Sequence, residues 1–72
     1  MTDDDYRTYL KLSIIDGLRQ YCKLSNADIS KVIDNTDLLE FIDDCYFTMH
    51  QQGVRANVLM VKEYLKNIGY TI

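Results

Sequence analysis

Apolar residues recur at helical spacing along most of the chain. Between positions 6 and 23, apolar residues recur every three or four residues and would share one face of a helix, a spacing that strand alternation does not fit. This face comprises Leu10, Ile14, Leu18 and Tyr21, widened by Ile15 and Cys22. Three aspartates, Asp3 to Asp5, precede this face. Acidic side chains are favourable there because they lie beside the unpaired N–H groups and the positive end of the helix dipole. The pattern predicts a first helix over 6–23.

Two features of this first helix predict contacts with other groups. Gly17 lies in its middle, where glycine costs roughly 1 kcal/mol in helix propensity and contributes no side chain, so we expect another helix to cross closely there. Arg7 and Lys11 lie one turn apart, nearer the apolar face than the acidic one. Either their stems cover the edge of the core, which we favour, or their charges meet an acidic partner.

The segment from Leu24 to Ile29 predicts the start of a second helix. Ser25 can accept a hydrogen bond from the N–H of Asp28, and the Asp28 carboxylate can reach back to the N–H of Ser25, which is the reciprocal arrangement of a capping box. This short helix would end in four residues that prefer caps and turns, Asp34 to Asp37.

The longest helical pattern follows, over 38–53. Asp37 paired with Glu40 is its strongest cap, although Asn35 or Thr36 could serve. Gly53 is placed to end the helix in a left-handed conformation. The inner stripe of this helix comprises Leu38, Ile42, Cys45 and Met49, whereas the residues predicted to face away are Glu40, Asp43 and Asp44.

A last helix is predicted over 57–68 and closed by Gly69. Its seam comprises Val58, Val61, Leu65 and Ile68, while the apolar residues on other sides are Leu59, Met60 and Tyr64. The first half of this helix is therefore apolar nearly all round, which a small monomer cannot easily bury. We expect it to pack on two sides, in one arrangement across a homodimer.

The composition is that of a small folded protein. Apolar types make up 47% of the 72 residues and charged types 26%, with no proline and three glycines. A chain this short makes one domain at most, 1–72, and rarely gains more than about 3–5 kcal/mol of stability from its own core. We predict an all-α fold: a compact four-helix bundle with a short second helix, either monomeric or dimeric.

Charge and cysteine usage indicate the kind of partner and the cellular compartment to expect. The formal charge is −3, and the eight Lys and Arg are scattered among eleven Asp and Glu, so nucleic-acid binding is not favoured. The acidic start at Met1–Asp5 does not resemble a signal peptide, and no apolar run is long enough for a membrane span. We therefore expect a cytoplasmic protein whose two cysteines, Cys22 and Cys45, are reduced and act as small apolar side chains.

No set of residues predicts catalysis, a metal or a cofactor. His50 is the single histidine, and Cys45 lies five residues before it on a different face of the helix, so a Cys–His nucleophile is not favoured. We expect His50 to bond carbonyl groups at the helix end or to contact a partner. Asp43 and Asp44 are predicted to form a solvated acidic face rather than a cation site.

Phe47 is the most informative residue for function. On the predicted helix it lies opposite the inner stripe, among acidic side chains. Either a neighbouring helix covers it, or it is an aromatic anchor inside an acidic rim, which is a common form of binding hot spot. The sequence leaves these two alternatives open.

Three segments carry a family pattern: Leu24-Ser25-Asn26-Ala27-Asp28, the run from Tyr46 through His50 to Gly53, and Val58 to Tyr64. They resemble a short bacterial domain family of unknown function, with the pattern Leu-Ser-Gly-x-Glu, then Tyr-Asp-x-Leu-His-x-x-Gly, then a hydrophobic helix with a tyrosine near its end. The chain departs from that pattern at Asn26, Phe47 and Met49.

The resemblance implies a role as an accessory protein. Genes of such proteins are often neighbours of an ADP-ribosyltransferase-like protein, so the implied role is a small antitoxin-like partner, and no catalytic residues are carried over. Tyr46 and His50, one turn apart, could form either a hydrogen-bonded structural corner or part of a binding site.

Three functions are weighed, of which the third, an enzyme that uses His50, requires a concave pocket around that residue. The first is a non-enzymatic protein–protein interaction module that regulates a larger protein encoded nearby, with a partner-binding surface of Tyr46, Phe47, His50, Asp43 and Asp44. The alternative is a dimeric DNA-binding regulator, which predicts a basic stripe assembled from Arg7, Lys11, Arg55 and Lys62. Acidic residues on the third helix oppose its use as a recognition helix, because phosphate would repel them.

Overall fold

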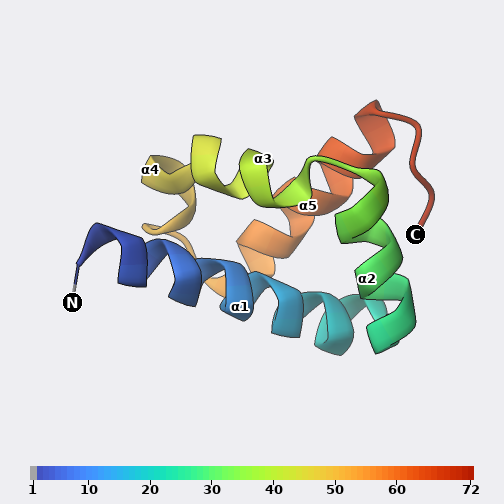
Figure 1. Cartoon of the computed structure of the whole chain (residues 1–72), viewed down its shortest axis with the longest axis horizontal. Helices are drawn as coiled ribbons and strands as arrows, with labels where there is room; N and C mark the ends of the chain where they lie inside the picture. The colour runs from blue at the N-terminus through green and yellow to red at the C-terminus, as the bar shows by residue number, and fades with distance from the viewer. Residues whose placement is uncertain (1) are drawn as a thin grey trace.

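The computed structural model describes residues 2–72 and contains five helices in this part of the chain (Figure 1). In chain order they are α1 (Asp3–Cys22), α2 (Asn26–Asn35), α3 (Leu38–Asp44), α4 (Tyr46–Met49) and α5 (Val54–Asn67). The all-α prediction is confirmed for the described residues. The bundle has five helices instead of the predicted four, because the expected central helix is divided into α3 and α4.

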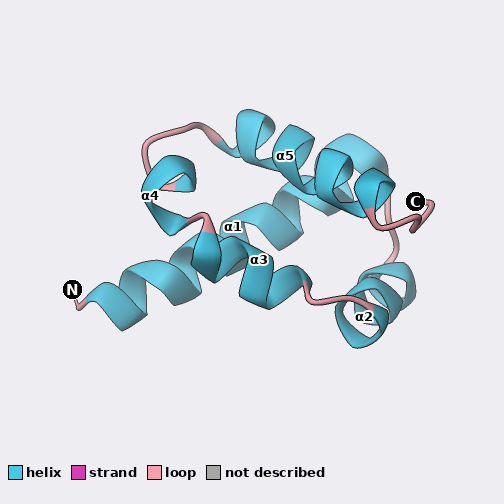
Figure 2. Ribbon diagram, turned by 90° about the horizontal axis from the view of Figure 1, so that it is seen from above, coloured by secondary structure: helices cyan, strands magenta, loops and turns pink. Residues whose placement is uncertain are grey.

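Two long helices organise the fold. In the two ribbon views, α2 and α4 lie at opposite ends of the molecule, while α1 and α5 run between these ends (Figures 1 and 2). The N-terminus lies near the α4 end and the C-terminus near the α2 end. The radius of gyration is 11.4 Å, close to the roughly 11 Å expected of a compact chain of this length.

Side chains cap the first two helices as their sequences require. At α2 the predicted capping box is confirmed: the N–H of Asp28 donates to Ser25 Oγ over 3.1 Å, and the N–H of Ser25 donates to Asp28 Oδ2 over 3.3 Å. The same arrangement joins Thr2 and Asp5 at the start of α1. Both caps satisfy N–H groups that the first turn of a helix leaves without a partner.

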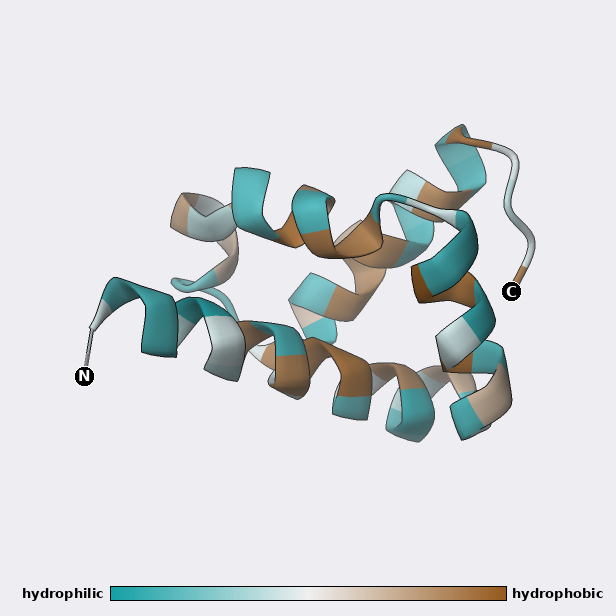
Figure 3. Ribbon diagram, in the orientation of Figure 1, coloured by the Kyte–Doolittle hydropathy of each residue, from teal (hydrophilic) through white to brown (hydrophobic). Residues whose placement is uncertain are grey.

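The core follows the predicted stripes closely. Its most deeply buried apolar residues come from all five helices and include Ile14, Leu18, Val32, Leu38, Ile42, Met49, Val61 and Leu65. Apolar and polar segments alternate along each ribbon, as amphipathic packing requires (Figure 3). Two residues of the predicted stripes are misplaced: Tyr21 on α1 is 45% exposed, and Ile68, just beyond α5, is 51% exposed.

Gly17 marks the closest approach of α1 and α5, as the sequence predicts. A Cβ atom at this position would lie 2.6 Å from Val58 Cγ2 and 2.8 Å from Val54 Cγ2. These distances are far shorter than van der Waals contact, and valine side chains on a helix have little rotamer freedom with which to yield. The missing side chain of Gly17 is therefore a condition of this helix crossing.

The predicted continuous helix over 38–53 breaks at Cys45, whose φ and ψ are −98° and 14°. A guanidinium N–H of Arg7 donates to the carbonyl oxygen of Asp43 over 2.9 Å. In an uninterrupted helix that carbonyl would accept the N–H of Phe47, four residues later. A contact from α1 thus occupies the acceptor at the point where the helix turns, which local sequence could not indicate.

The break also changes the neighbouring helix ends. Helix α4 ends at Met49, so Gly53 is not a left-handed C-terminal residue; its φ is −72° and it precedes α5. Helix α5 consequently begins at Val54 instead of Asn57. The predicted cap of Asp37 with Glu40 is wrong as well. Thr36, one of the alternatives, accepts the N–H of Leu38 and donates to the carbonyl of Val32.

Surplus apolar surface on α5 is largely covered within the chain. The rings of Tyr64 and Phe41 stack with centroids 4.3 Å apart and planes inclined by 16°. Met60 is half-buried against the same core. Leu59 stays 59% exposed, so one of the three apolar residues outside the seam remains free to meet another molecule.

Candidate interaction surface

Asp43 joins the third helix to the first instead of facing away. Lys11 Nζ lies 2.8 Å from Asp43 Oδ2, and Arg7 donates to Asp43 Oδ1 over 3.3 Å as well as to its carbonyl oxygen. The prediction that Asp43 belongs to an outward acidic face is therefore corrected, because two cations of α1 draw it to the edge of the core. Asp44, the next residue, is exposed as predicted.

These contacts also set the ionisation of Asp43. The hydrogen bond from Lys11 is the largest cause that holds the pKa of Asp43 below its ordinary value of 3.8, and Arg7 adds to the effect while partial burial opposes it. A pKa that is lower in the folded state than in the unfolded state means stability that is present above the unfolded pKa and lost as the pH falls through the folded one.

We expect Asp43→Asn to lower the free energy of unfolding at pH 6 by about 1 kcal/mol or less, since the pair is partly exposed to water. The difference between wild type and variant should shrink as the pH falls through 3.8, where the carboxyl of the unfolded state is protonated, and should vanish below the lower pKa of the folded state. Urea denaturation at pH 6 and pH 3 measures it. Asp44→Asn is the matched control and should show no such loss; equal effects at both positions would remove Asp43 from this role.

The ring of Tyr46 contacts two polar side chains, those of Arg7 and His50. The Arg7 guanidinium carbon is 4.4 Å from the centroid of the Tyr46 ring, a cation–π distance. The His50 ring stacks on the same tyrosine, with centroids 4.8 Å apart and planes inclined by only 9°. Arg7 is itself fixed by Asp43, so a chain of contacts from α3 and α1 orients the aromatic groups of α4.

His50 bonds a helix carbonyl, as the sequence predicts. Its Nδ1 lies 2.8 Å from the carbonyl oxygen of Tyr46. A carbonyl oxygen can only accept, so Nδ1 carries the hydrogen in this contact and Nε2 is left to face solvent or a partner. Tyr46 and His50 therefore form a hydrogen-bonded, stacked corner on the short helix α4.

Phe47 is exposed, so the alternative in which a neighbouring helix covers it is wrong for the described chain. Its side chain is 79% accessible, the highest value among the large apolar residues of the described chain. Its ring meets Tyr46 and His50 edge to face, with centroid separations of 6.3 and 6.0 Å. We call Tyr46, Phe47 and His50 the α4 aromatic surface.

A hollow of about 290 Å³ adjoins this surface, between α1, α4 and the start of α5. Its aromatic lining comprises Tyr6, Tyr9, Tyr46 and His50, and its polar lining includes Ser13 and Gln52. Tyr6 and Tyr9 are exposed, whereas Met49 and Leu10 close the hollow against the core. Sequence reasoning missed Tyr6 and Tyr9, although two tyrosines at a spacing of three residues on a helix share a face.

Asn57 is a second feature that the sequence did not reveal. It is 1% exposed, and its amide joins the two sides of the α4–α5 loop: Nδ2 donates to the carbonyl of Met49 over 3.0 Å, and Oδ1 accepts from Gln52 over 2.9 Å. Both halves of the amide are thus satisfied in the core. The residue fixes the loop that forms one wall of the hollow.

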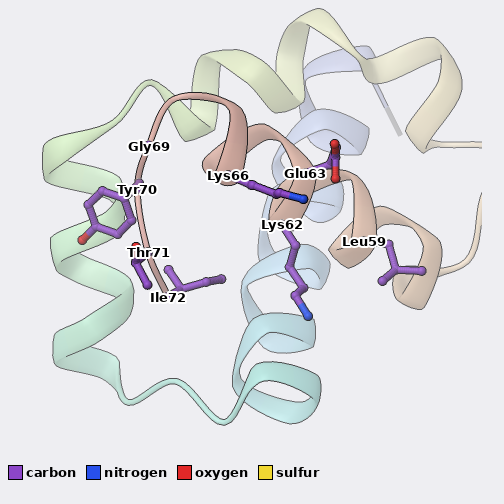
Figure 4. A pocket seen from close by; sticks show the side chains of 8 residues that line it. All are labelled: Leu59, Lys62, Glu63, Lys66, Gly69, Tyr70, Thr71 and Ile72. Atoms are coloured by element: carbon purple, nitrogen blue, oxygen red, sulfur yellow. The ribbon is translucent and has the colours of Figure 1, made fainter.

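A different groove of about 440 Å³ lies between α5 and the C-terminal segment (Figure 4). Leu59, Lys62, Glu63 and Lys66 line it together with the segment from Gly69 to Ile72. Its charged lining is therefore mixed, with two lysines and one glutamate.

Within residues 2–72 no three His, Cys, Asp or Glu side chains are grouped so that they could hold a metal ion. The same part of the chain holds no helix that is long and apolar enough to cross a bilayer. Cys22 and Cys45 are free thiols, each half-buried. The described chemistry at the surface is thus aromatic stacking, hydrogen bonding and ion pairing.

Fold and surface together define a class: a small all-helical protein with an exposed aromatic surface on a one-turn helix. The chain belongs to the DUF3791 family, described as proteins of unknown function, whose model matches residues 10–68. No curated protein and no solved structure matches it. The family assignment agrees with the sequence resemblance in being a family of unknown function, and it covers all five helices at least in part.

Proposed function

We propose that this chain is a small, non-enzymatic protein-binding module that presents its α4 aromatic surface to a larger bacterial protein in the cytoplasm. The observation that carries the proposal is the exposure of Phe47, 79% accessible on a segment whose neighbours are held in place. An aromatic side chain left in water offers a large apolar area to a partner at little further cost in side-chain entropy.

The surroundings of Phe47 support this role. Tyr46 and His50 are oriented by stacking and by a hydrogen bond, so the surface is organised before a partner arrives. Preorganisation favours affinity because fewer groups must be ordered on binding. Asp44 and His50 supply exposed polar groups at the rim, whereas Asp43 contributes indirectly by fixing Arg7.

The role proposed for the complex is antitoxin-like or inhibitory. It rests on the sequence resemblance, which implies an ADP-ribosyltransferase-like protein encoded nearby. It also rests on the small size of the chain, which favours binding through its outer surface. A homodimer through α5 is a further part of the proposal and would use Leu59, the exposed apolar residue of that helix. DNA binding has less support, since Arg7 and Lys11, two of the four residues of the predicted basic stripe, are held by Asp43.

The expected result of Phe47→Ala is loss of the partner with the fold intact. The side chain is mostly in water, so the helical content and unfolding midpoint should stay near wild type, while affinity should fall at least tenfold, as for a truncated hot spot. The measurement is co-purification from host cells, followed by binding of the protein encoded by the neighbouring gene.

Leu12→Ala is the matched control, because it removes another exposed apolar side chain, one that lines neither the hollow beside α4 nor the groove beside α5. It should retain the partner on which Phe47→Ala fails. A wild-type protein that retains nothing specific, or partners held equally by both variants, would show that α4 is not the binding surface.

A further inference from the structure

We infer that the hollow beside the α4 aromatic surface receives an arginine side chain from a basic segment of the partner. The inference rests on the proposed function and names the chemistry that the partner must bring. Tyr6, Tyr9 and Tyr46 line the hollow with His50, so a side chain that enters meets aromatic rings on several sides. The faces of aromatic rings attract cations as well as apolar groups.

The hollow is large enough to receive one side chain. Its volume of about 290 Å³ is just below the roughly 300–1,000 Å³ of pockets that enclose small-molecule ligands. Phe47 does not line the hollow, but its ring centroid lies 6.3 and 6.0 Å from those of Tyr46 and His50, which do, so Phe47 would contact the same partner segment. One inserted side chain next to an exposed aromatic anchor is how interface hot spots commonly pair.

Charge selects a cation for this place. Asp3 lies one turn before Tyr6 and Asp5 one turn before Tyr9, so both exposed carboxylates stand on the tyrosine side of α1. Arg7 and Lys11 share the single carboxylate of Asp43 and leave one positive charge, and Arg55 follows Val54 without lining the hollow. The three exposed carboxylates of Asp3 to Asp5 outnumber these two positive charges, so the local field favours a positive group, in line with the formal charge of −3.

Arginine fits the polar lining better than lysine. A guanidinium is planar, stacks on tyrosine and carries five N–H donors. Ser13 and the tyrosine hydroxyls can accept from it, as can the side-chain oxygen of Gln52, whose nitrogen already donates to Asn57. The protein itself uses the same contact, since Arg7 lies over the ring of Tyr46 at 4.4 Å.

The test is an NMR titration of the full chain with short Gly/Ser peptides that carry one central residue: arginine, citrulline, tryptophan or glutamate. The arginine peptide should move the ring signals of Tyr6, Tyr9 and His50 saturably, with a dissociation constant of about a millimolar. Citrulline keeps the shape of arginine without its charge and should bind at least tenfold more weakly, as should glutamate.

Tyr9 allows a matched pair of variants because its side chain is 66% exposed and is not needed by the core. Tyr9→Phe keeps the aromatic ring and should retain the arginine peptide, whereas Tyr9→Leu keeps apolar area without the ring and should weaken it about tenfold. Equal binding of citrulline and arginine, stronger binding of tryptophan, an unaffected Tyr9→Leu, or no saturable shift would each overturn the inference. So would broadening of the Tyr6 and Tyr9 signals with protein concentration alone, which would show a second copy in the hollow.

Failure of the inference and failure of the proposed function give different patterns. Partner binding that depends on Phe47 but is unchanged in Tyr9→Leu would leave the interaction module standing and remove the arginine. Saturable binding of the arginine peptide, with partner binding indifferent to Phe47→Ala, would keep the hollow and remove the α4 aromatic surface from the interface.

Discussion

Replacing Asn57 with aspartate should lower the free energy of unfolding by about 3 kcal/mol or more at neutral pH. The carboxylate would be 1% exposed, would lose the N–H donor to the carbonyl of Met49, and would set a negative charge against that oxygen. A chain of 72 residues rarely gains more than about 3–5 kcal/mol of stability from its own core, so the loss would be a large share of the total. Urea denaturation followed by circular dichroism measures it.

The pH dependence distinguishes a buried charge from a simple packing defect. Burial raises the pKa of the new carboxyl in the folded state, so the cost should be small where both states are protonated and should grow as the pH rises above about 3.9, where the unfolded state ionises. Asn26→Asp is the matched control: it makes the same change at the exposed start of α2, beside Arg19. That variant should be neutral or slightly stabilised; an Asn57→Asp protein as stable as wild type would contradict the role given to the buried amide.

Replacing Gly17 with valine should lower the free energy of unfolding by about 2–3 kcal/mol. The first added carbon would already lie 2.6 Å from Val58 Cγ2 and 2.8 Å from Val54 Cγ2, and the core there would be overpacked. A slight gain in helix propensity does not offset the separation of α1 from α5 that this clash requires. Thermal and urea unfolding measure the change.

Two variants locate the cause of that loss. Gln20→Val introduces the same side chain at an exposed position of α1 and should cost about 0.5 kcal/mol or less. Combining Gly17→Val with Val58→Ala should cost less than the sum of the two single changes, because the smaller side chain makes room at the crossing. Strict additivity would mean that the two helices do not press on each other at Gly17.

The two stability predictions and the proposed function depend on the same set of contacts between helices. Gly17 lets α5 approach α1, and Asn57 near the start of α5 fixes the loop that follows α4. Arg7 then meets the end of α3 and the ring of Tyr46. Phe47 is left in water by an arrangement that the core and the ion pairs support, so its exposure is a property of the whole fold.

The sequence by itself determined the helical class, most of the core stripes and the cap of α2. These depend on interactions within a few residues, such as the four-residue recurrence of Leu10, Ile14 and Leu18, or the reciprocal bonds of Ser25 and Asp28. It also indicated a close helix crossing at Gly17, because glycine within a helix lowers the stability of the helix but lets another helix approach closely.

Only the tertiary structure decided the break at Cys45, the place of Asp43 and the exposure of Phe47. Each follows from groups far apart in the chain: Arg7 reaches across 36 positions to the carbonyl of Asp43. Periodicity reports which face of one helix is apolar, but it does not report which charged side chain of another helix will meet that face. The aromatic hollow beside α4 exists for the same reason, since its walls come from α1, α4 and α5 and no local pattern brings them together.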